Sequence, residues 1–294
     1  MFSGVITAIV TPFRRGNIDE ASLTELINRQ IRHRIKGIVA CGTTGESATL
    51  SMEEHVKVVE IAVRQVRGRV PVIAGCGSNS TEDTVFLTRQ AKQLGADGAL
   101  IVNPYYNKPT QTGLLRHFEK VAKEVEIPIV LYNIPSRTGV NMAPATVAKL
   151  SQIPHIKAIK EATGSIDQAM EILRLSGNRI TVLSGDDAMF LPLLAIGAKG
   201  IISVTSNVVP RDVTHLYNAF IEGRHLDAKR LNRKLWPLIK AMFFETNPIP
   251  VKTALAKMGL INDEMRLPLC SMTRANRKRL REVMTAYGLL KGDA

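Results

Sequence analysis

The sequence predicts a TIM (β/α)8 barrel, a closed ring of eight parallel strands alternating with helices, followed by a C-terminal helical appendage. Three observations indicate this fold. Short apolar runs rich in β-branched residues recur eight times, helical segments separate them, and the last part of the chain is helical. No GxGxxG pattern follows the first strand, which disfavours an open dinucleotide-binding sheet.

The expected strands are short and regularly spaced along the chain. They are GVITAIV (4–10), GIVACG (37–42), VPVIAG (70–75), GALIVN (98–103), PIVLYN (128–133), HIKAIK (155–160), RITVLS (179–184) and GIISVT (200–205). We therefore expect a catalytic barrel domain over residues 1–223 and a helical region over residues 224–294.

The segments between the strands carry helix signals. Ser51 and Glu54 form a capping box that opens one helix, and Ser80 opens another. Apolar residues from Leu114 to Val125 follow the 3–4 spacing of one buried helix face. Three further helices are expected in the C-terminal region, within residues 225–243, 248–259 and 274–288.

The composition is that of a soluble globular protein, with 294 residues, 45% hydrophobic and 22% charged. Neither a signal peptide nor a membrane span is expected. Three scattered cysteines, Cys41, Cys76 and Cys270, indicate reduced thiols and a cytoplasmic location. The net charge of +13 is partly concentrated in RANRKRLR (274–281). This segment lacks interleaved aromatic residues, so we expect a solvated helix face; the alternative is a basic scaffold that binds nucleic acid.

In a barrel of this kind the active site lies at the carboxyl ends of the strands. Those positions carry GTTGE (42–46), PYYNKPT (104–110), YNIPSRTG (132–139), KEATG (160–164) and SGDD (184–187). There is no histidine cluster, so a zinc site is not expected. Adjacent carboxylates such as Asp186 and Asp187 can bind a cation but more often cap the following helix, so no metal is expected.

A lysine at the end of a strand can attack a carbonyl to form an imine, which helps to make or break a neighbouring C–C bond. Burial favours the neutral amine that this step needs. Alternation along the strand places Lys160 on one face with Ile156 and Ala158, and Lys157 on the other with Ile159. Lys160 lies nearer the catalytic end, so we expect it to form the imine and Lys157 to be solvated or structural.

Neighbouring strand ends supply groups that suit this chemistry. Tyr132 ends the adjacent strand and can exchange protons, although a core tyrosine would look the same in sequence. Thr43 and Thr44, in a glycine-flanked turn, can hold a carboxylate. Arg137 can bind a second carboxylate through its planar fork, unless it forms only a surface ion pair.

These residues belong to longer motifs with a recognisable pattern. The motifs are GTTGESATL (42–50), PYYNKPTQTGL (104–114), YNIPSRTG (132–139), IKEATG (159–164), LSGDDA (183–188) and NPIPVK (247–252). Together they resemble the 4-hydroxy-tetrahydrodipicolinate synthase family, formerly dihydrodipicolinate synthase, over nearly the whole chain. The alternative is another pyruvate-dependent Schiff-base aldolase or lyase, such as N-acetylneuraminate lyase or a keto-sugar-acid aldolase.

The resemblance implies that Lys160 forms a Schiff base with pyruvate, whose enamine then attacks L-aspartate 4-semialdehyde. The product is 4-hydroxy-tetrahydrodipicolinate, on the diaminopimelate route to lysine. Tyr132, Thr43 and Tyr106 would form a proton relay, with Tyr106 donated across a tight dimer interface, commonly within a homotetramer. No metal or organic cofactor is implied.

The resemblance also implies the groups that hold the substrates. Thr44 would bind the pyruvate carboxylate and Arg137 the semialdehyde carboxylate. The backbones of Gly185 and Ile202 would line the pocket.

A feedback site for L-lysine at the dimer interface is implied as well. Its residues would be Ser47, Ala48, His55, Asn79, Asp83 and Tyr105. Met52 stands where lysine-sensitive members often carry histidine, and Asp83 replaces their glutamate. We therefore expect lysine inhibition to be weakened or absent.

Overall fold

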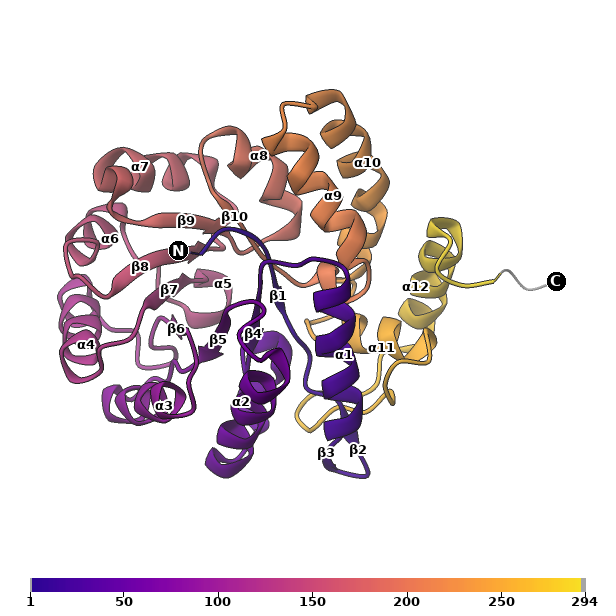
Figure 1. Ribbon diagram of the computed structural model, residues 1–294, viewed down its shortest axis with the longest axis horizontal. Coiled ribbons are helices and arrows are strands. Elements are labelled where there is room, and N and C mark those ends of the chain that lie inside the picture. Colours follow the sequence, from indigo (N-terminus) through magenta and orange to yellow (C-terminus); the bar gives the residue numbers. More distant parts are fainter. Residues whose placement is uncertain (1, 292–294) are drawn as a thin grey trace.

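The computed structural model describes residues 2–291 and confirms the barrel fold. Eight parallel strands close in the order β1-β10-β9-β8-β7-β6-β5-β4 (Figure 1). They are β1 (Gly4–Ala8), β4 (Gly37–Ala40), β5 (Val72–Gly75), β6 (Gly98–Val102), β7 (Ile129–Asn133), β8 (Ile156–Glu161), β9 (Thr181–Ser184) and β10 (Gly200–Ser203). A short antiparallel hairpin of β2 (Phe13–Arg14) and β3 (Asn17–Ile18) follows β1.

Helices surround the strands on the outside of the barrel (Figure 1). They are α1 (Glu20–Arg32), α2 (Met52–Val66), α3 (Thr81–Gln93), α4 (Gln111–Glu124), α5 (Pro135–Thr138), α6 (Pro144–Leu150), α7 (Ile166–Ser176), α8 (Phe190–Ala195) and α9 (Pro210–Ile221). The predicted capping box is present, because Ser51 and Glu54 each accept the other's backbone N–H. Ser80 is the N-cap of α3, and its side chain accepts a hydrogen bond from the backbone N–H of Asp83.

Three more helices complete the chain: α10 (His225–Ala241), α11 (Ile249–Lys257) and α12 (Arg274–Tyr287). Helix α10 packs along α9, and α12 packs against α10 and α11, so these helices form one group on the right of Figure 1. The basic helix α12 is held by two buried apolar side chains, Leu280 and Met284, while most of its charged residues remain exposed. Within residues 2–291 no helix is long and apolar enough to cross a membrane.

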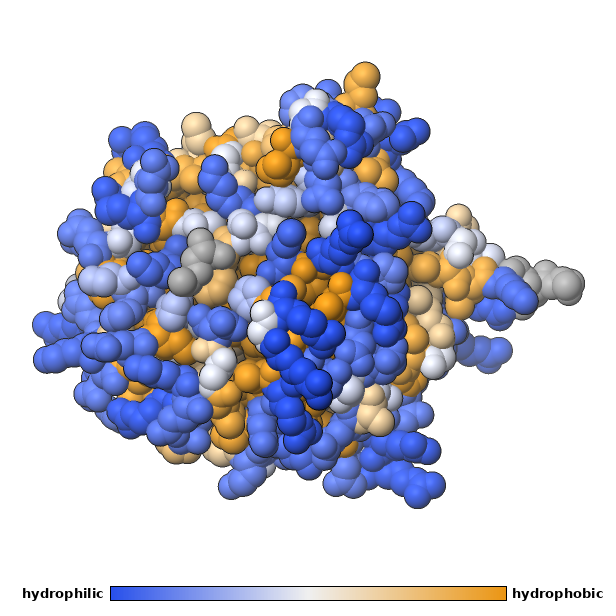
Figure 2. Space-filling model, viewed as in Figure 1, coloured by the Kyte–Doolittle hydropathy of each residue, from blue (hydrophilic) through white to orange (hydrophobic). Residues whose placement is uncertain are grey.

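The core has two layers, which follow from the alternation of side chains along each strand. A smaller cluster takes one or two apolar residues from every barrel strand and therefore fills the barrel interior. It consists of Phe2, Ile6, Ala8, Val39, Ile73, Leu100, Val130, Tyr132, Ala158, Leu183 and Ile202. A larger cluster lies between the strands and the helices. The face seen in Figure 2 is covered mainly by hydrophilic residues, as expected when apolar side chains occupy both layers.

One detail of β8 corrects the sequence analysis. Strict alternation would place Ile156 on the face of Ala158 and Lys160, but Ile156 belongs to the outer apolar cluster and Ala158 to the inner one. The register with β7 shifts at this point, since Ile129 pairs with Ile156 and Val130 with Ala158. Beyond the irregularity the alternation holds, so the expected orientation of Lys160 is unaffected.

Burial of His117 in α4 gives the fold a dependence on pH. Its Nδ1 lies 2.9 Å from the Thr81 hydroxyl, and burial lowers its pKa from the usual 6.5 to about 4. The unfolded chain therefore binds a proton that the folded chain does not, and stability should fall as pH drops from about 6.5 towards 4. At full effect this loss is about 3 kcal/mol.

We expect urea unfolding of the protein to show a clearly lower midpoint at pH 5 than at pH 7. The difference should be smaller in His117→Phe, which cannot titrate, while His55, whose pKa is also lowered by burial, keeps part of it. A His117→Phe variant that keeps the full difference between pH 5 and pH 7 would contradict this assignment.

Candidate active site

Lys160 lies at the carboxyl end of β8 and points into the barrel. Its side chain is only 5% exposed, whereas Lys157 is exposed on the opposite side of the strand. Strand pairing places Tyr132 directly beside it, and the Lys160 Nζ lies 4.1 Å from the centre of the Tyr132 ring. Within residues 2–291, Lys160 has no carboxylate partner. The arrangement is a buried amine beside a phenol, without a carboxylate partner among the described residues.

Gly185, after β9, borders the Lys160 side chain. A Cβ at this position would lie 2.7 Å from the Ala162 side chain and 3.0 Å from Lys160 Cγ, so any larger residue would clash with Ala162 and press on the lysine. Ile202, on β10, is fully buried in the inner cluster. Both positions therefore lie at the barrel end that contains Lys160.

Thr43 and Thr44 lie in a single 3-10 turn, η1 (Thr43–Gly45), directly after β4. The Thr44 hydroxyl is buried and accepts a hydrogen bond of 3.0 Å from Asn247 Nδ2. The turn ends at Glu46, whose φ of 54° is left-handed and whose carboxylate forms a fully buried ion pair with Lys252. Two residues of the C-terminal region thus hold the turn in place.

Arg137 lies in the short helix α5, directly after β7. Its Nη2 donates a 3.0 Å hydrogen bond to the backbone carbonyl of Asn247. The rest of the guanidinium keeps donors for a ligand, because arginine has five N–H groups. Asn247 therefore contacts both groups that the sequence analysis assigned to substrate carboxylates.

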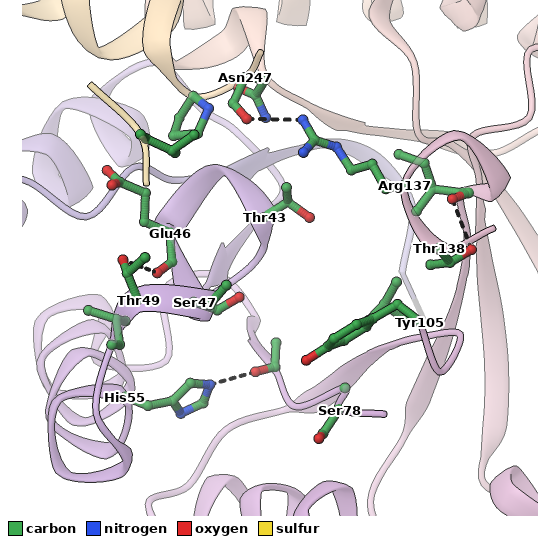
Figure 3. A pocket seen from close by; sticks show the side chains of 18 of the residues that line it. Thr43, Glu46, Ser47, Thr49, His55, Ser78, Tyr105, Arg137, Thr138 and Asn247 are labelled. Carbon is green, nitrogen blue, oxygen red and sulfur yellow. Dashed lines mark hydrogen bonds between the residues drawn. The ribbon is translucent and has the colours of Figure 1, made fainter. Parts of the chain in front are cut away.

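A pocket of about 430 Å³ opens beside these residues (Figure 3). Thr43, Arg137 and Asn247 lie at one end of it, and His55 and Tyr105 at the other. Ser47, Ala48 and Met52 also line it. Four of the six residues expected for a lysine site are therefore brought together in one pocket, which Thr43 and Arg137 also line.

A second pocket, of about 300 Å³, lies on the other side of Arg137. It is lined by the loops after β7, β8 and β9, including Gly185, and by Lys240 and Phe243 at the end of α10. Lys160 lines neither pocket, but it contacts Gly185 and so lies next to the floor of the second.

Besides Lys160, six expected residues line neither pocket: the buried residues Thr44, Tyr132 and Ile202, and the residues Tyr106, Asn79 and Asp83. Tyr106 is 88% exposed, with a left-handed φ of 73°. Asn79 and Asp83 lie nearby, where the Asp83 carboxylate accepts a 3.4 Å hydrogen bond from the pocket residue Ser78. His55 is held with its Nε2 2.7 Å from the Gly75 carbonyl, and burial lowers its pKa below the usual range.

The expectation for the two aspartates is half correct. Asp186 caps the turn that follows β9 by accepting the Ala188 N–H. Asp187 does not cap a helix: it is buried and accepts from the Ser203 hydroxyl and from two backbone N–H groups after β10. Burial raises its pKa. Within residues 2–291 no group of three or more His, Cys, Asp or Glu side chains is arranged to hold a metal ion.

Sequence reasoning missed several residues that support the site. Asn247 and Lys252 are the first and last residues of NPIPVK, a motif that was quoted above for the resemblance but given no role. The presence of this motif was the available signal. Behind Lys160, the buried carboxylate of Glu161 accepts a 3.2 Å hydrogen bond from Asn133, the residue after Tyr132. Lys160 and Tyr132 therefore both have a chain neighbour, Glu161 and Asn133, that takes part in this hydrogen bond.

Comparison with known proteins agrees with this geometry. The model of the dihydrodipicolinate synthetase family matches residues 1–287. A 4-hydroxy-tetrahydrodipicolinate synthase from Thermodesulfovibrio yellowstonii is 56% identical over 99% of this chain and 100% of its own length.

Solved structures are similarly close. The dihydrodipicolinate synthase of Acinetobacter baumannii, described as chloride inhibited and complexed with pyruvate, has a TM-score of 0.97 and 44% identity over 99% of this chain and 100% of its own. The enzyme of Cyanidioschyzon merolae, solved with lysine bound, has a TM-score of 0.96 and 40% identity, covering 98% of this chain and 99% of its own. These similarities favour the synthase over the other pyruvate-dependent aldolases considered above.

Proposed function

Because the chain belongs to the dihydrodipicolinate synthetase family and condenses pyruvate with L-aspartate 4-semialdehyde, we propose that Lys160 is the amine that carries the reaction. The observation that supports this role is the burial of Lys160 beside the Tyr132 ring with no carboxylate partner among residues 2–291. A neutral amine in this position is a nucleophile for the pyruvate ketone.

The proposed reaction proceeds in four steps. Lys160 attacks the ketone and water leaves, which gives the imine. Loss of a methyl proton gives an enamine, whose carbon attacks the aldehyde of the semialdehyde. The substrate's own amino group then displaces the lysine and closes the ring of 4-hydroxy-tetrahydrodipicolinate. Tyr132 is proposed to move protons at the imine nitrogen, in a relay with Thr43 and with Tyr106 of a second subunit.

The substrates need two carboxylate-binding groups, and these are proposed to be Thr44 for pyruvate and Arg137 for the semialdehyde. The backbones of Gly185 and Ile202 complete the pocket. We propose residues 1–223 as the catalytic barrel domain and residues 224–294 as a supporting helical region. No metal or organic cofactor enters the proposed reaction.

A homotetramer built from tight dimers is proposed for the assembly. Two features of the described surface support self-association: Tyr106 is 88% exposed, and Ile166 and Met170 of α7 are 44% and 52% exposed. A cytoplasmic enzyme acting on small molecules, without nucleic-acid or membrane partners, fits the buried and unpaired cysteines Cys41 and Cys76.

Borohydride reduction in the presence of pyruvate tests the proposal. We expect a stable pyruvate adduct on Lys160 alone, mapped by mass spectrometry of the digested protein. Reduction without pyruvate is the control and should leave every lysine unmodified. An adduct on Lys157, or no adduct at all, would refute the proposed chemistry.

The larger pocket is proposed as the site for L-lysine, with Ser47, Ala48, His55 and Tyr105 in its lining and Asn79 and Asp83 contributing from beside it. Met52 offers a thioether where a histidine could accept or donate a hydrogen bond, and aspartate at position 83 reaches less far than glutamate. We therefore expect weak or absent inhibition by L-lysine in a steady-state assay. Replacing Met52 with histidine should strengthen inhibition, and half-maximal inhibition of the unaltered protein at submillimolar lysine would contradict the expectation.

A further inference from the structure

Asn247 links the two proposed carboxylate-binding groups of the barrel to the C-terminal helical region. It lies between α10 and α11, is 4% exposed, and lines the larger pocket. Its side-chain amide donates to the Thr44 hydroxyl, and its backbone carbonyl accepts from Arg137, each at 3.0 Å. Figure 3 shows it at the pocket end that also holds Thr43 and Arg137.

The direction of the first hydrogen bond matters for Thr44. A threonine hydroxyl has one proton to donate and can accept at its oxygen. Because Asn247 Nδ2 is the donor here, the Thr44 proton is not used in this contact. Within residues 2–291 the Thr44 hydroxyl makes no other hydrogen bond, so its proton remains for a ligand. A carboxylate, which only accepts hydrogen bonds, is a suitable ligand.

The same C-terminal segment also fixes the position of the turn. Lys252, five residues after Asn247, pairs with Glu46, two residues after Thr44, and both side chains are fully buried. The second oxygen of Glu46 accepts the backbone N–H of Arg266 at 3.2 Å. The turn that carries Thr44 is therefore anchored at two points by residues beyond position 246.

We propose that Asn247 is a positioning residue that leaves the Thr44 hydroxyl free to donate to the pyruvate carboxylate. This inference rests on the proposed function, because it assigns a mechanism to the proposed pyruvate contact. It also means that the C-terminal region completes the substrate site. The opposite arrangement, in which Thr44 donates to the Asn247 oxygen, would consume the proton that the substrate needs.

Two substitutions at position 247 distinguish these arrangements. Asn247→Ala removes the donor but keeps the backbone carbonyl that holds Arg137. The pyruvate concentration for half-maximal borohydride trapping should rise about tenfold, and the KM for the semialdehyde should change much less. Asn247→Asp can only accept, so it would turn the Thr44 proton away from pyruvate, and trapping should be weaker still. In a Thr44→Val background neither substitution should add a further effect on pyruvate.

Asn276→Ala is the matched control, because this asparagine of the same region donates to Glu245, and neither residue lines either pocket. It should leave pyruvate trapping unchanged. If Asn247→Asp traps pyruvate as well as the unaltered protein, or Asn247→Ala shows no shift, the inference fails while the proposed function stands. If the unaltered protein is not trapped at Lys160, the proposed function itself fails.

A crystal structure of the unaltered protein with pyruvate tests the same inference without relying on variants that fold. The Thr44 oxygen should lie within hydrogen-bond distance of both Asn247 Nδ2 and a pyruvate carboxylate oxygen. A pyruvate carboxylate bound out of reach of Thr44 would overturn the inference.

Discussion

Replacing Lys160 with arginine is expected to lower the turnover of pyruvate and L-aspartate 4-semialdehyde by at least about a thousandfold. A guanidinium remains charged at every pH at which the protein is folded, so it cannot attack the ketone. Arginine is also a long side chain, so the variant removes the nucleophile without truncating the residue. The rate can be measured in an assay coupled to the reductase that consumes the product.

Lys157 provides the matched control three residues away in the same strand. Its side chain is exposed, so Lys157→Arg should change turnover by less than about twofold. Circular dichroism should show that both variants fold. A Lys160→Arg protein that retains substantial turnover, or a Lys157→Arg protein that loses it, would exclude the proposed imine.

The position of Lys160 could be predicted because it depends on local rules. Strand alternation separates Lys157 from Lys160, and parallel strands bring Tyr132 and Lys160 to the same barrel end. The same rules failed at Ile156, where one extra residue in the pairing moves the side chain to the outer face. A register shift depends on the neighbouring strand, and the sequence of one strand does not reveal it.

The contacts that hold the turn after β4 could not be predicted, because they join residues far apart in the sequence and no local sequence pattern connects them. Thr44 and Asn247 are 203 residues apart, and Glu46 and Lys252 are 206 residues apart. Sequence reasoning therefore described the C-terminal region as an appendage, although its residues hold the turn after β4. Tyr106 is the reverse case: its proposed partner lies in a second subunit, so the folded single chain leaves it exposed.

Replacing Lys252 with methionine is expected to destabilise the protein by about 3–5 kcal/mol, because it leaves the Glu46 charge buried without its partner. Both side chains are fully buried, and the Lys252 ammonium also lies 4.2 Å from the centre of the Phe13 ring. Burial lowers the pKa of Lys252 even with Glu46 beside it, so the site already disfavours isolated charge. Urea unfolding followed by circular dichroism measures the loss.

Two comparisons show whether the unpaired charge is the cause. Combining Lys252→Met with Glu46→Gln removes both charges and should recover more than half of the lost stability. Lys120→Met breaks an exposed pair with Glu82, whose side chains are 47% and 73% exposed, and should cost less than about 1 kcal/mol. Because Glu46 follows Thr44 by two residues, Lys252→Met should also raise the KM for pyruvate. A Lys252→Met protein as stable as the unaltered one would show that this ion pair does not anchor the turn.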